Sequence, residues 1–223
     1  MRVTVSKKDL LRVLARCQGV ADKKSTMPVL GNVLVEAVEP DQLRLAATDL
    51  YLAVSGTVSA KVEKPGTIAV GARDLFDRAR MMPDGELSIS TDGSSTTIRA
   101  VGSARRYTLH GVPGEEFPSL PQPDAAAPEL DLDVASLATL INATHFSISN
   151  DETRVHLNSA MFEWDGSTVR MVTTDGHRLS KMELHSGDKE ANASMLIPLK
   201  GVMELKRLCD EALSESSGDT TPA

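Results

Sequence analysis

An internal repeat is the feature that most constrains how this chain folds. The segment PVLGNVLVEAVEPDQLRLAATDLYLAVSGTV in the first half is matched by TRVHLNSAMFEWDGSTVRMVTTDGHRLSKMEL in the second. Aligning Asn32 with Asn158 sets the two segments 126 residues apart, and the same offset places Asp49 on Asp175. Because order, spacing and residue pattern all agree, the sequence predicts two units of one fold.

Each unit is predicted to contain a short strand, a helix, two or three alternating strands, a further strand and a second helix. Upstream of the matched segments, an offset of 127 residues places Leu10 on Leu137 and Leu14 on Ile141, on the apolar faces of the first helices. The first unit is expected to have strands at residues 30–37, 42–47, 52–58 and 67–70, and helices at 7–19 and 72–82. In the second unit, the expected first helix is 133–145.

The two units differ after their second helix. The first continues through ELSIST, TTIRAV and ARRYTLHG, which predict three more strands, and then a Pro-rich stretch. The second helix of the second unit is expected to end near Leu213, before the polar sequence SESSGDTTPA. We therefore expect an α+β protein with a first domain at 1–120, a linker at 121–128, a C-terminally incomplete second domain at 129–213 and a disordered tail at 214–223. An unpaired sheet edge should leave the second domain weakly stable.

Composition is that of a soluble globular chain, with 41% hydrophobic residues, 25% charged residues and a formal net charge of −7. No apolar stretch is long enough for a transmembrane helix or a signal peptide. Cys17 and Cys209 lie in apolar helical patterns, which favours reduced thiols in a cytosolic protein. The acidic balance argues against a simple nucleic-acid binder, which would carry excess Lys and Arg.

The positive charges, however, are concentrated on the predicted helices. Helical spacings of four or seven residues place them on single helix faces, as in Lys8, Arg12 and Arg16, in Arg73 and Arg80, and in Lys200 and Arg207. The helix at 133–145 has neither Lys nor Arg. A basic surface made of helices would attract phosphates without reading bases. It is equally compatible with ordinary solvated helix faces.

Two other classes of function have to be weighed. An enzyme could use Asp175, His177 and Asp151, with Ser180 nearby. An Asp-Gly turn explains the Asp175 carboxylate, however, and Asp49 repeats it without a neighbouring histidine. The five histidines lack metal-ligand spacing and there is no phosphate-binding loop, so we expect no metal and no cofactor. The other class is a protein-interaction module that does not bind DNA, which gains support if the basic residues lie on unrelated surfaces.

Four segments, MPVLGNVLVEA, ATDLYL, NATHFSISNDETRVHLNSAMFE and VTTDGHRLS, resemble the bacterial DNA polymerase III beta subunit. The resemblance runs from Met1 to about Leu213. It implies tandem DNA-clamp domains, each with outer antiparallel sheets packed on two inner helices. It also implies a non-catalytic cytoplasmic protein with three such domains per subunit. Two subunits would join head to tail in a ring around double-stranded DNA and tether the replicative polymerase.

The resemblance implies three sets of site residues. The DNA-binding set is Lys24, Arg73, Arg80, Lys200 and Arg207. The pocket for short motifs of the polymerase, the clamp loader and other partners is Leu157, Thr174, Gly176, His177, Arg178 and Leu179. The subunit interface is Arg105, Arg106, Tyr107 and Leu109. Asp151, Val155 and His156 depart from the polar and aromatic residues that often contact DNA in the family. Without a third domain, the pocket is expected to be incomplete and two copies are not expected to close a ring.

Overall fold

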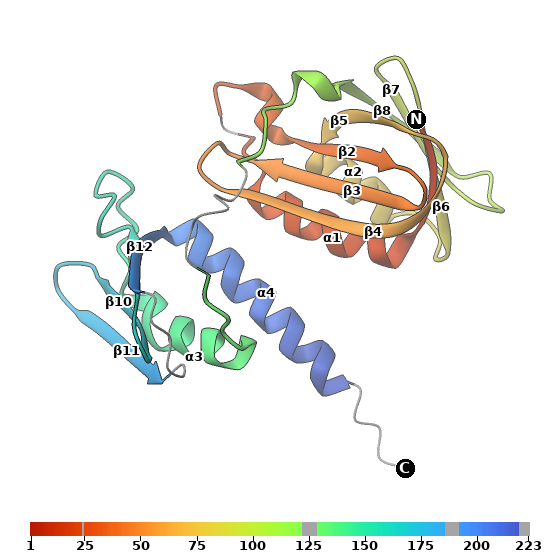
Figure 1. Ribbon diagram of the computed structural model, residues 1–223. Coiled ribbons are helices and arrows are strands. Elements are labelled where there is room, and N and C mark those ends of the chain that lie inside the picture. Colours follow the sequence, from red (N-terminus) through yellow and green to blue (C-terminus); the bar gives the residue numbers. More distant parts are fainter. Residues whose placement is uncertain (24, 122–128, 186–191, 219–223) are drawn as a thin grey trace, which may run out of the picture. The chain divides into compact units, whose positions relative to one another are not determined.

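The computed structural model describes residues 1–23, 25–121, 129–185 and 192–218 (Figure 1). The chain divides into two compact units, residues 1–122 and 123–223, and each is described by itself. The division falls inside the stretch where the sequence predicted a linker.

Eight strands of the first unit form a closed sheet in the order β1-β4-β3-β2-β5-β8-β7-β6. All neighbouring strands are antiparallel. Alternating burial along β2 and β6 follows from the period of two that the sequence shows. The strands are β1 (Arg2–Ser6), β2 (Asn32–Val38), β3 (Gln42–Thr48), β4 (Ala53–Lys64), β5 (Gly66–Gly71), β6 (Glu86–Asp92), β7 (Ser95–Ala100) and β8 (Arg106–Pro113).

Two helices, α1 (Lys7–Val20) and α2 (Ala72–Arg80), pack beside each other and against this sheet. Their apolar faces supply Leu10, Leu14 and Leu75 to the core, and all three side chains are fully buried. The helices therefore have one face on the sheet and the other toward solvent. Short 3-10 turns, η1 (Pro28–Gly31) and η2 (Gly114–Glu116), complete the unit.

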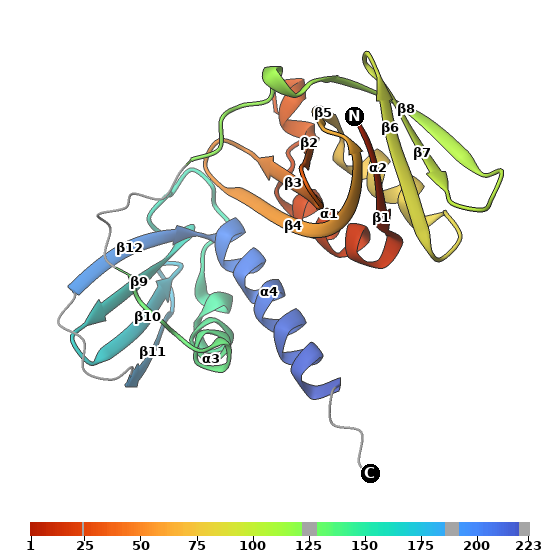
Figure 2. The same cartoon turned by 45° about the vertical axis from the view of Figure 1, so that its right-hand side comes forward.

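The second unit has a four-stranded antiparallel sheet in the order β11-β10-β9-β12, with two helices packed on it (Figure 2). The strands are β9 (Ser159–Asp165), β10 (Thr168–Thr174), β11 (Leu179–His185) and β12 (Asn192–Pro198). The helices are α3 (Val134–Thr144), which is followed by the 3-10 turn η3 (His145–Ser147), and α4 (Leu199–Gly218). This order repeats β4-β3-β2-β5 of the first unit, as the sequence repeat predicts. Its core includes Leu140, Ile141 and Met171.

The predicted strand before the first helix of the second unit is wrong. Residues 129–133 precede α3 without strand pairing, whereas their counterpart β1 lies between β4 and β6. β1 pairs with the far half of β4, at Ala60 to Lys64. β11 has 7 residues against 12 in β4, and the described second unit contains no strand in the place of β6. Among the described strands, a strand at 129–133 therefore has no partner on either side.

The prediction of a disordered tail from residue 214 is also wrong in part. α4 continues to Gly218 instead of ending near Leu213. The hydroxyl groups of Ser214 and Ser216 donate to the carbonyls of Glu211 and Ala212 inside the helix. Serine costs only a few tenths of a kcal/mol in a helix, so these polar residues extend the helix rather than end it. Residues 219–223 lie outside the described part of the chain.

Candidate functional site

Arg73 and Arg80 lie on the solvent face of α2. Leu75 and Ala79, on the other face of the helix, are fully buried in the core. The two arginine side chains are 64% and 65% exposed. Arg12, on the neighbouring helix α1, is also exposed. In the first unit, the helix layer thus presents several guanidinium groups on the side away from the sheet.

Asp77 lies between the two arginines and moderates their charge. Its carboxylate is 3.7 Å from Arg73 Nε and 3.5 Å from an Arg80 terminal nitrogen. The Arg80 guanidinium also lies over the Phe76 ring, 5.8 Å from its centroid. Ion pairs this long and this exposed contribute little stability, so an incoming phosphate can replace the carboxylate at small cost.

In the second unit, the basic residues of α4 are held more tightly by acidic neighbours. Arg207 donates from Nε and from a terminal nitrogen to one oxygen of Glu204, at 3.0 and 2.8 Å. Lys206 donates to Asp210 at 2.9 Å. Lys200 lies in the first turn of the same helix. Lys24, the remaining member of the predicted DNA-binding set, lies outside the described residues.

The predicted partner pocket centres on the loop between β10 and β11. Asp175 Oδ1 accepts hydrogen bonds from the backbone N–H groups of His177 and Arg178, at 2.9 and 3.0 Å. Thr174 Oγ1 accepts from Gly176 N and donates to the Arg178 carbonyl. Gly176 has a φ of 91°, a conformation that favours glycine. The Arg178 and His177 N–H groups lower the pKa of Asp175 to about 2.

The side chain of Arg178 connects this loop to η3. Its Nε donates to Asp175 Oδ2 at 3.0 Å, and a terminal nitrogen donates to the Phe146 carbonyl. The guanidinium carbon lies 5.8 Å from the centroid of the Phe146 ring. Leu179 is 64% exposed beside it, and Leu157 is partly buried. Phe146 lies in the segment NATHFSISNDETRVHLNSAMFE but is not among the predicted pocket residues, because the sequence alone does not distinguish an exposed aromatic residue from a core one.

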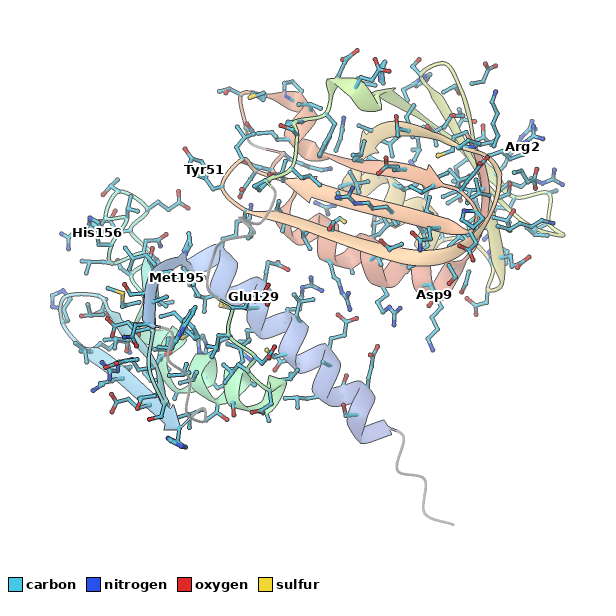
Figure 3. All side chains as sticks on the ribbon, viewed as in Figure 1. Arg2, Asp9, Tyr51, Glu129, His156 and Met195 are labelled. Atoms are coloured by element: carbon cyan, nitrogen blue, oxygen red, sulfur yellow. The ribbon has the colours of Figure 1, made fainter. Side chains whose placement is uncertain are left out.

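The first unit contains a twin of this loop between β3 and β4. Thr48 Oγ1 accepts from Leu50 N and donates to the Leu52 carbonyl, while Asp49 Oδ1 accepts from Tyr51 N and Leu52 N. Leu50 takes a φ of 76°, in the region that Gly176 occupies in the second unit. Tyr51 projects from the loop into solvent and is 94% exposed (Figure 3). The repeat therefore extends to individual hydrogen bonds.

Three of the predicted interface residues, Arg106, Tyr107 and Leu109, lie on β8, and the fourth does not. Arg105 precedes the strand, and its backbone N–H donates to Ser103 Oγ. Tyr107 and its neighbours pair with β7 on one side, while the strand pairs with β5 only through residues 111–113. β8 is therefore not a full edge strand, since only its first half has an open side among the described strands. The Arg78 guanidinium lies over the Tyr107 ring at 5.2 Å.

The geometry around Asp175 does not support the alternative of an enzyme that uses acid–base chemistry. The carboxylate of Asp175 is occupied by the loop backbone and by Arg178, and Ser180 Oγ lies 2.7 Å from Ser147 Oγ. Within the described ranges, no group of three or more His, Cys, Asp or Glu side chains is arranged to hold a metal ion. Among those same residues, no helix is both long and apolar enough to span a membrane.

Comparison with known proteins decides the family. Residues 1–121 match the profile of the DNA polymerase III beta subunit N-terminal domain, and residues 131–216 match that of its central domain. The chain belongs to the DNA polymerase III beta subunit family. Members of this family are non-catalytic polymerase subunits.

Its relatives include the beta sliding clamp of Escherichia coli K12, which is 34% identical over 212 residues, 94% of this chain and 57% of the relative. A Pseudomonas aeruginosa sliding clamp crystallised with griselimycin superposes with a TM-score of 0.86 at 33% identity, covering 95% of this chain and 57% of that one. A Caulobacter crescentus sliding clamp superposes with a TM-score of 0.87 at 31% identity, covering 95% of this chain and 58% of that one. The chain thus spans less than two thirds of the length of these relatives.

Proposed function

We propose that this chain acts as part of a sliding clamp that holds a DNA polymerase on duplex DNA, with its helices toward the DNA. The observation that carries the proposal is the solvent face of α2, where Arg73 and Arg80 are exposed while Ala72, Leu75 and Ala79 anchor the opposite face in the core. Lys24, Lys200 and Arg207 complete the proposed set. Such contacts are to phosphates, so binding should be independent of base sequence and steeply dependent on salt.

The test is the affinity for a duplex oligonucleotide, measured by fluorescence anisotropy at several salt concentrations. We expect the double variant Arg73→Glu, Arg80→Glu to lower the slope of log K against log salt by about two, because each lost phosphate contact removes about one counterion. The matched control is Lys61→Glu with Lys64→Glu, which makes the same charge change on exposed residues of β4. If the two double variants give equal slopes of log K against log salt, the DNA-binding role of α2 is rejected. A protein-interaction module that does not bind DNA is then the better description.

We further propose that the loop between β10 and β11 binds short motifs of partners such as the replicative polymerase and the clamp loader. The proposed residues are Leu157, Thr174, Gly176, His177, Arg178 and Leu179. The exposure of Leu179 beside a hydrogen-bonded loop supports this, since rigid apolar surface binds at low entropic cost. The griselimycin complex of the P. aeruginosa clamp shows that a relative of this fold accepts a ligand.

Griselimycin serves as the probe for this pocket, through its affinity for the intact chain. Arg178→Ala with Leu179→Ala should weaken binding at least tenfold, because the double variant removes both a cation and an apolar wall. The control truncates the side chains at the two matching positions of the twin loop, Leu52→Ala with Ala53→Gly, and should leave affinity unchanged. Equal affinity of wild type and the pocket variant would remove the assignment.

A further inference from the structure

Phe146 is an exposed aromatic residue that is held in position by contacts with Arg178. It lies in η3, directly after α3, and is 51% exposed. An exposed aromatic ring offers a large apolar area with few rotatable bonds, which is the profile of a binding residue.

Three contacts join η3 to Arg178 in the loop and to Ser180 at the start of β11. A terminal nitrogen of Arg178 donates to the Phe146 carbonyl, the guanidinium lies over the Phe146 ring, and Ser147 Oγ is 2.7 Å from Ser180 Oγ. Asp175 Oδ2 in turn holds Arg178 from the loop side. The ring is thus kept in place before any ligand arrives, which lowers the entropy lost on binding.

The first unit shows that the loop itself does not need this arrangement. Its twin loop has the same Thr and Asp hydrogen bonds with Leu52 in the place of Arg178. Leu52 is partly buried and packs on the core of its unit. By the offset of 127 residues, Gly19 stands where the second unit has Phe146. The pairing of guanidinium and ring is therefore an addition to a loop that folds without it.

We infer that Phe146 is a further binding residue of the partner pocket, where its ring receives an apolar side chain of an extended partner peptide. Arg178 has five N–H donors and spends two of them on Asp175 and Phe146, so others can meet a carbonyl oxygen of the same peptide. Exposed Leu179 continues the apolar surface from the loop. This inference rests on the pocket proposed above and adds to it a residue outside the predicted pocket set.

The experiment measures the affinity of the intact chain for labelled griselimycin by fluorescence anisotropy. Phe146→Ala should weaken binding about tenfold, and Phe146→Leu, which keeps an apolar side chain, should recover most of the loss. The matched control is Tyr51→Ala, which removes the exposed aromatic residue of the twin loop and should leave affinity unchanged. Amide exchange of β9 to β11 checks that the Phe146 variants keep the wild-type fold, and exchange of β3 and β4 checks the same for Tyr51→Ala.

The outcomes separate this inference from the pocket on which it rests. If Leu179→Ala weakens binding while Phe146→Ala binds like wild type, the pocket stands and the role of Phe146 is overturned. If Phe146→Ala and Tyr51→Ala weaken binding equally, the effect is not specific to this surface and the inference is also overturned. If neither wild type nor any variant binds griselimycin, the proposed pocket fails and the inference fails with it.

Discussion

The two units share one arrangement of four strands and two helices, and they differ in whether the sheet closes. In the first unit, β8 covers the free side of β5 and β1 covers that of β4. In the second unit, β12 and β11 are the outer strands of the described sheet. Ile68 of β5, which pairs with core residue Val35, is 2% exposed, whereas Met195 of β12, which pairs with core residue Phe162, is 46% exposed. The same local pattern therefore gives the same local structure, while burial depends on strands supplied from elsewhere.

The largest expected effect comes from matched cavities in the two cores. Leu14 and Ile141 are aligned by the repeat and both are fully buried. Replacing either by Ala should cost about 3 kcal/mol, since it removes buried apolar atoms and leaves a cavity. In calorimetry, Leu14→Ala should lower the melting transition of the first unit alone, and Ile141→Ala that of the second alone. A single transition lowered equally by both variants would show that the units do not unfold separately.

A second prediction concerns the pairing of β8 with β5, which helps to close the sheet of the first unit. A Cβ at Gly111 would lie 2.6 Å from the Ala69 carbonyl oxygen and 2.7 Å from a Val70 methyl carbon, at the joint between β8 and β5. Gly111→Ala should therefore cost about 2 kcal/mol through overpacking. Amide exchange should become faster in β5 and β8, making this edge resemble β12. Unchanged exchange at that joint would mean that closure contributes little to the difference between the units.

A smaller effect is expected from exchanging the residues with positive φ in the twin loops. Leu50 and Gly176 hold matching positions, with φ values of 76° and 91°. Gly176→Leu should destabilise the second unit by about 1 kcal/mol, because side chains with a Cβ are disfavoured in that conformation. Leu50→Gly should change the stability of the first unit by less, since relief of strain is offset by added freedom in the unfolded chain. Chemical denaturation measures both, and equal effects of the two changes would contradict the shared loop geometry.

The smallest effect concerns pH. The pKa of Asp175 is about 2, lowered chiefly by the backbone N–H groups of Arg178 and His177. A depressed folded pKa gives stability that is present above about pH 4 and is lost as pH falls through 2. Carbon NMR of the carboxyl group should give a midpoint near 2. Asp175→Asn should remove this part of the pH dependence, and a midpoint near 4 would show that the loop bonds are absent in solution.

Features that depend on local sequence patterns were predicted, and features that depend on long-range contacts were not. The repeat, the alternating strands and the helix faces are local patterns, and they located Leu14, Ile141 and the solvent-facing arginines of α2. The absence of a strand at 129–133 could not be predicted from such patterns. A strand there would need a longer β11 and a neighbour equivalent to β6, and both lie far from it in the sequence. Phe146 was missed because its contact with Arg178 joins residues 32 apart in the sequence, which no local pattern reveals.

One fold thus occurs twice, with a closed sheet in the first unit and an open sheet among the described strands of the second. The chain has a single tryptophan, Trp164, which is buried in the second unit. Its fluorescence in a urea titration therefore follows the second unit, while far-UV circular dichroism follows both. We expect the fluorescence to change at lower urea than the main transition in circular dichroism. Coincident transitions, or a fluorescence change at higher urea, would contradict it.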